Sequence, residues 1–289
     1  MIDPSKGGRG VRKFLLSLAA AATALAATFG ATHAEALPVA PSPAPPVTGI
    51  PTPCHAKHPF PEDASVPEIK EQLAETFHFR LTGSHWSEEY RPSIRILWET
   101  LDAVSCTTYL PDLQGKFQGT VGINATSTSG WSWGDWSLSK PGYVSLDLQK
   151  FRTALDNGDE GRLVRLVIHE LAHVYNSDRY SSPKYWSEFQ RLHEQEGTFS
   201  EYAGSSVTET FADTVGYYVG RCALNNPYDT GKFDGYYEFV KDNVFHGKEF
   251  GPAPGKKPNC TVPSKDAQEP RPGDPAALDA DWVSDLAGE

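Results

Sequence analysis

The chain has 289 residues, and its 37 acidic and 26 basic side chains give a formal net charge of -11 at pH 7. An acidic protein is a poor partner for nucleic acid and for anionic membrane surfaces, because like charges repel. With 39% hydrophobic residues, the length suits one folded domain together with flanking segments.

The N-terminus has the pattern of an export signal. Three basic side chains within 9–13 precede an apolar stretch over 14–29, and the small residues Ala34 and Ala36 follow at cleavage-site spacing. The apolar stretch is shorter than the ~20 residues that a spanning helix needs. We therefore expect a signal peptide over 1–36, secretion to the extracellular space or the cell wall, and no stable membrane insertion after cleavage.

Proline content divides the remainder of the chain. Residues 37–60 are dense in proline, which favours an extended linker over a packed core. Residues 251–289 are polar and rich in proline and charge, so we expect a partly disordered tail. The folded domain is then expected over 61–250, a length that can bury a core of its own.

The four cysteines are Cys54, Cys106, Cys222 and Cys260. No two of them have the short spacing of a structural zinc site, and in an oxidising compartment four cysteines indicate two disulfides. Three pairings are open. We expect nearest neighbours to pair, which joins Cys54 to Cys106 and Cys222 to Cys260.

In the first half of the domain, the sequence pattern predicts two helices followed by strands. Apolar residues recur at helical spacing over 67–79 and 88–104. From 117 to 148 the composition changes to glycine, threonine, serine, aromatic and β-branched residues, which is typical of strands and turns. We expect a single α+β domain, mostly helical, with a small mixed sheet before the next helix.

Three tryptophans, Trp131, Trp133 and Trp136, lie close together in the predicted sheet region. Exposed aromatic rings could grip a peptide or a glycan. Aromatic side chains more often bury their large area, so we favour a packed hairpin or loop over a binding surface.

The next helix carries the most informative motif, His-Glu-x-x-His, at His169, Glu170 and His173. Residues four apart lie on one face of a helix, so the two imidazoles can bind one metal ion. Glu170 is turned about 100° from His169, which places its carboxylate beside the ion as a candidate general base. The helix is supported by a broad apolar surface at Leu163, Val164, Leu166, Val167, Ile168, Leu171, Ala172, Val174 and Tyr175.

A second apolar helical run, over 206–219, carries Glu209 and Asp213, again four residues apart. Ser206 or Ser205 is a suitable N-cap for it. A catalytic zinc takes three protein ligands and keeps one position for water, so Glu209 can complete the ligand set. Asp213 can then orient a ligand imidazole through its second ring nitrogen.

Other zinc-peptidase patterns fit less well. Glu201 is an alternative third ligand, because residues 197–201 resemble the Gly-Thr-x-x-Asp element of the aspzincins, with Glu in place of Asp. The metzincin pattern requires a glycine and a third histidine where Asn176 and Arg179 stand, and a methionine turn that the chain lacks, since Met1 is its only methionine.

Over about 162–221 the chain resembles the gluzincins, and among them the catalytic domain of anthrax lethal factor. The resemblance implies a zincin-like fold, zinc held by His169, His173 and Glu209, and Glu170 as the general base.

The resemblance also implies two supporting residues. A tyrosine seven positions before the third ligand is expected to stabilise the transition state, and Tyr202 stands there. Asp213 stands at the position of the acid that orients a ligand imidazole, where the lethal-factor type has Glu. His193 is an alternative hydrogen-bond donor, although a surface position is the simpler interpretation.

These patterns predict a secreted zinc endopeptidase that acts on a peptide or protein substrate. The alternative is a secreted binding or inhibitory module that keeps the zincin fold at the cell wall without cleaving peptides. An intact base and three intact ligands favour the enzyme. The sequence indicates no oligomeric state.

Overall fold

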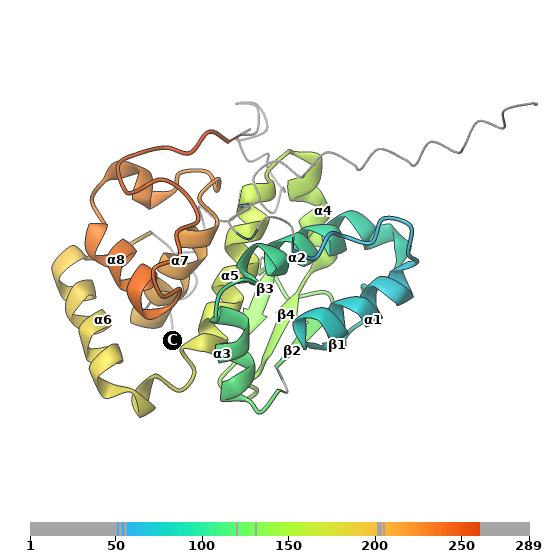
Figure 1. The fold of residues 1–289 in the computed structure, drawn as a ribbon, viewed down its shortest axis with the longest axis horizontal. Coiled ribbons are helices and arrows are strands. Elements are labelled where there is room, and N and C mark those ends of the chain that lie inside the picture. The colour runs from blue at the N-terminus through green and yellow to red at the C-terminus, as the bar shows by residue number, and fades with distance from the viewer. Residues whose placement is uncertain are drawn as a thin grey trace, which may run out of the picture. The chain divides into compact units, whose positions relative to one another are not determined.

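The computed structural model describes the following residues of the chain: 51, 54, 57–119, 121–130, 132–200, 204 and 206–260. The predicted signal peptide, most of the proline-rich linker and the last 29 residues lie outside this part. Within it, eight α-helices and a four-stranded mixed sheet give an α+β architecture (Figure 1). The expected class, a mostly helical domain with a small sheet before the motif helix, is confirmed.

The helices before the sheet are α1 (Val66–Phe77), the short 3-10 helix η1 (Glu88–Tyr90), α2 (Arg91–Val104) and α3 (Tyr109–Lys116). A capping box starts α1, because Glu68 Oε2 accepts hydrogen bonds from the backbone N and Oγ of Ser65 at 2.7 and 2.6 Å. The two predicted helices are therefore present, whereas α3 was not predicted.

The sheet consists of β1 (Arg80–Thr82), β2 (Gly122–Ala125), β3 (Gly134–Trp136) and β4 (Tyr143–Leu146). Its order is β1-β2-β4-β3, with β1, β2 and β4 parallel and β3 antiparallel to β4. Among the described strands, β3 is thus an edge strand. The region 117–148 holds three strands as predicted, and the short strand β1 joins them from earlier in the chain.

The remaining elements are α4 (Leu148–Asp156), α5 (Glu160–Tyr175), η2 (Arg179–Ser181), α6 (Pro183–Glu196), α7 (Val207–Val219), η4 (Pro227–Thr230) and α8 (Asp234–Asn243). The motif helix is α5. It lies between the sheet with α2 and α3 on one side and α7 on the other (Figure 1). Elements from both halves of the domain therefore surround the motif.

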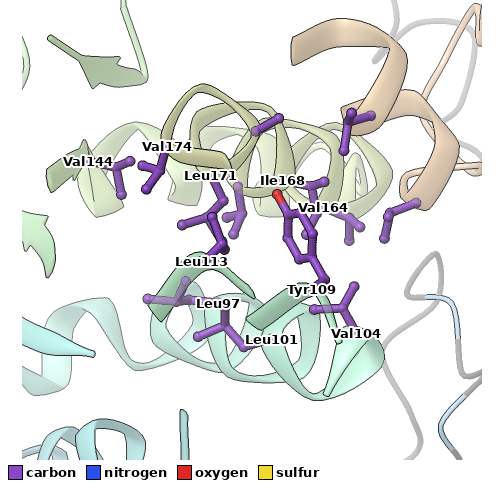
Figure 2. Close-up of a cluster of buried hydrophobic side chains, with 14 of the residues drawn as sticks. Leu97, Leu101, Val104, Tyr109, Leu113, Val144, Val164, Ile168, Leu171 and Val174 are labelled. Carbon is purple, nitrogen blue, oxygen red and sulfur yellow. The ribbon is translucent and has the colours of Figure 1, made fainter. Parts of the chain in front are cut away.

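The core explains how α5 is oriented. Its apolar face turns Val164, Ile168, Leu171 and Val174 toward α2 and α3, where Leu97, Leu101, Val104, Tyr109 and Leu113 meet it (Figure 2). All of these side chains are buried, and full burial of each aliphatic one stabilises the fold by about 1.5–3 kcal/mol. With this face fixed, the motif histidines point to the opposite side, toward α7.

Both expected disulfides are present. Cys54 and Cys106 have Cα atoms 5.4 Å apart and join the end of the linker to the residues after α2. Cys222 and Cys260 have Cα atoms 5.7 Å apart and tie the segment beyond α8 to the residues after α7. That segment also contacts the domain through Arg221, whose Nη2 donates to the carbonyl of Lys256 at 3.1 Å. None of the helices in the described part of the chain combines the length and the hydropathy of a membrane-spanning segment.

Candidate metal centre

Two glycines allow α7 to pack closely against α5. A Cβ at Gly216 would be 2.9 Å from the Arg165 carbonyl oxygen, and one at Gly220 would be 2.9 Å from Arg165 Cα. Any larger residue would push the helices apart. Ser206 caps α7 as predicted, because its Oγ accepts a hydrogen bond from the backbone N of Glu209 at 3.1 Å. The close approach brings the first two turns of α7 against the histidine face of α5.

Three ligand atoms converge between the two helices. His169 Nε2 and His173 Nε2 are 3.2 Å apart, and Glu209 Oε2 lies 3.2 Å from the first and 3.3 Å from the second. Both histidines are buried, and Glu209 is half-buried. This group could hold a metal ion.

The size of this triangle fits a tetrahedral ion. With bonds of 2.0–2.2 Å to imidazole nitrogen and carboxylate oxygen, tetrahedral zinc places neighbouring ligand atoms about 3.3–3.6 Å apart. The observed separations of 3.2, 3.2 and 3.3 Å lie at the short end of this range. Apart from these contacts with the two imidazoles, the buried Glu209 Oε2 has no hydrogen-bond partner in the described part of the chain, as expected of an atom directed at a cation.

The electrostatics of the triangle also favour a cation. Three atoms with electron pairs face one another, so positive charge, a proton or a metal ion, must lie among them. Burial opposes protonation of His169, but hydrogen bonding to Asp213 and Glu209 outweighs it and raises the pKa of His169 to about 10. Burial also opposes ionisation of Glu209, and its contacts with both imidazoles lower its pKa below the usual value.

Asp213 forms a hydrogen bond with Nδ1 of His169, the ring nitrogen that faces away from the triangle. Its Oδ1 accepts from His169 Nδ1 at 2.9 Å and from Arg165 Nη1 at 2.9 Å, and its Oδ2 accepts from Ser200 Oγ. Burial alone would raise the pKa of Asp213, yet the charge of Arg165 and these hydrogen bonds lower it. With Nδ1 of His169 donating to this anion, its Nε2 is left to bind an ion.

These pKa values predict that metal binding depends on pH. At pH 7 the metal-free site holds a proton on His169, and an ion must displace it to bind. We expect about one proton to be released per zinc bound, so the affinity should rise about tenfold per pH unit between pH 6 and 9. Calorimetry in buffers of different ionisation enthalpy measures the proton count. A pH-independent affinity would contradict the assignment.

Glu170, the candidate base, lies beside the triangle. It is buried, and burial raises its pKa above the usual value, while the neighbouring imidazoles of His169 and His173 oppose part of the rise. The carboxylate packs against the edge strand, where a Cβ at Gly134 would lie 2.4 Å from Glu170 Oε1. Any larger residue at position 134 would displace the carboxylate of Glu170.

The tryptophans divide between the core and the site. Trp133 is buried, as the packed interpretation predicts, and Trp131 lies outside the described residues. Trp136 is half-buried and stacks on His173, with ring centroids 5.2 Å apart and planes 11° apart. This contact with a ligand was not predicted.

The structure does not describe every residue that the sequence analysis assigned to the site. Tyr202 and Glu201 lie outside the described residues. His193 lies on α6, where its Nδ1 is 3.3 Å from the hydroxyl of Tyr236 in α8. Sequence reasoning missed Arg165, although it stands one helical turn before His169 and its charge could have been matched to that of Asp213.

Comparisons of the chain with protein families, with curated proteins and with solved structures gave no match. The function is therefore inferred from the geometry of the site.

Proposed function

We propose that this protein is a secreted zinc-dependent peptidase of the gluzincin type. One observation carries the proposal: His169, His173 and Glu209 form a ligand triangle of tetrahedral size, and the buried carboxylate of Glu170 lies beside it. Three protein ligands leave a fourth position for water, which is the pattern of catalytic zinc sites, whereas structural sites close all four.

The chemistry that this arrangement supports is hydrolysis of an amide bond. Zinc, when bound, supplies a Lewis acid that polarises a carbonyl and acidifies water. Glu170 is the residue that takes the proton from the attacking water and passes it to the leaving amine. Its raised pKa suits both steps, because a weakly acidic carboxyl group gains and returns a proton more readily near neutral pH. Asp213 keeps the His169 ring in place throughout.

The position of the edge strand supports an extended peptide as the substrate. Among the described strands β3 pairs with β4 alone, so its other edge offers backbone groups to an incoming chain. Gly134, at the start of β3, touches the proposed base. A peptide added to this edge would run past Glu170. The two disulfides suit an oxidising extracellular compartment, in line with the predicted signal peptide.

Metal removal tests the proposal. The purified mature chain should contain one equivalent of zinc by elemental analysis and should cleave casein. Dialysis against a chelator should abolish cleavage, because the attacking water loses its activation. Stoichiometric zinc should restore cleavage, and magnesium, which prefers all-oxygen ligands, should not. Bound zinc with no cleavage of casein or of a diverse peptide library would instead support the binding-module alternative.

A further inference from the structure

The two ligand imidazoles are held by different kinds of contact. His169 donates from Nδ1 to Asp213 at 2.9 Å, which fixes both its tautomer and its ring plane. Within the described residues His173 Nδ1 has no hydrogen bond, so no acid plays the same part for it. Its ring instead lies flat against the indole of Trp136. Trp136 is thus the neighbour available to fix the second imidazole.

Trp136 is itself well anchored. Its Nε1 donates to the carbonyl of Pro141 at 2.9 Å, and its backbone is in register with Val144 in the antiparallel pair of β3 and β4. The indole is therefore held at its edge by a hydrogen bond and at its base by the sheet. A ring held in this way can act as a fixed platform for a neighbour.

The packing of β3 against α5 places the Trp136 indole at the site. Gly134 and Trp136 are two apart on the strand and so share one face, with a spacing of about 6.7 Å. Glu170 and His173 are three apart on the helix and lie about 5–6 Å from each other. Gly134 meets Glu170 while Trp136 meets His173. One face of the edge strand therefore contacts both the proposed base and a metal ligand.

We propose that Trp136 is the positioning residue of His173. The nearly parallel stack, with planes 11° apart, restricts rotation of the imidazole about its Cβ–Cγ bond and keeps Nε2 directed at Glu209 Oε2, 3.3 Å away. A metal-bound imidazole is electron-poor and the indole face is electron-rich, so the contact strengthens when an ion is bound. The stack thereby contributes to metal affinity. This inference rests on the proposed metal site.

The test is zinc affinity, measured on the mature chain by competition with a chromophoric chelator. Trp136→Leu removes the flat ring but keeps an apolar side chain, and we expect it to weaken zinc binding about tenfold, the lower end of the effect of losing a residue that orients a ligand. Trp136→Phe keeps a ring that can stack and should recover most of the affinity. Trp133→Leu is the matched control, because it removes a buried indole from the same segment.

A second readout reports the stack without metal. In the NMR spectrum of the metal-free protein, the indole should shift the Hε1 resonance of His173 upfield, and Trp136→Leu should abolish this shift while Trp133→Leu retains it. Folded Trp136→Leu protein that binds zinc as tightly as wild type would overturn the proposal, whether or not wild type cleaves casein. If the wild-type protein cleaves no peptide but Trp136→Leu still binds zinc more weakly than wild type, the positioning role of Trp136 is supported and only the proposed peptidase function is contradicted.

Discussion

Glu170→Gln is expected to abolish peptide cleavage while leaving the zinc content at one equivalent. The carboxylate is not one of the three ligand atoms, so the amide leaves the metal site intact. An amide cannot accept the proton from water, and loss of a general base costs about 10²–10⁴-fold in turnover. Glutamine has nearly the same shape and fits against Gly134. The measurements are kcat on casein-derived peptides and zinc by elemental analysis.

Stability separates loss of the base from loss of the fold. Burial raises the folded-state pKa of Glu170, so its ionised form disfavours the metal-free fold at pH 7, and a neutral amide should melt no earlier than wild type. Glu99→Gln is the control, since Glu99 is a half-buried glutamate on α2 whose pKa is also raised by burial. This variant should keep full activity. Cleavage by Glu170→Gln at the wild-type rate would remove Glu170 from the mechanism.

The sequence predicted the parts of the site that depend on local geometry. Spacing along one helix is enough to place His169 and His173 together, and the structure puts their Nε2 atoms 3.2 Å apart. The N-cap at Ser206 also follows from local chemistry, and so does the apolar face that orients α5. Glu209 was harder, because its approach depends on how two helices pack. The need of two histidines for a third ligand pointed to Glu209, and the structure places its Oε2 beside both imidazoles, where the three residues could hold a metal ion.

Contacts between elements distant in sequence were not predictable in the same way. Gly216 within α7 and Gly220 just after it allow α7 to approach α5, yet a glycine in a helical run is more often interpreted as destabilising than as part of a packing surface. Trp136 was expected to pack, but its partner depends on the register of a three-residue strand against a helix. Helix α3 was missed because its eight residues include a proline and a glycine, which weaken the helical pattern.

Glu209→Ala is expected to eliminate stable zinc binding. It removes one of three ligand atoms and leaves two imidazoles, which hold zinc far less tightly than a complete catalytic set. The loss of affinity should exceed the 10–100-fold that follows from removing a residue that only orients a ligand. Wild type should gain about 2.7 kcal/mol in unfolding free energy when free zinc is 100 times Kd, whereas the variant at that concentration should gain almost none. Thermal melts with and without zinc measure this difference.

Glu201→Ala is the matched control for this variant, because Glu201 is the other glutamate that the sequence offers as a third ligand. If Glu209 is the ligand, Glu201→Ala should keep one equivalent of zinc and the full thermal shift. The converse result, with zinc retained by Glu209→Ala and lost by Glu201→Ala, would move the third ligand out of α7. Such a result would also leave Glu209 Oε2, 3.2 and 3.3 Å from two imidazole nitrogens, as an ion-pair partner of protonated His169 instead of a metal ligand.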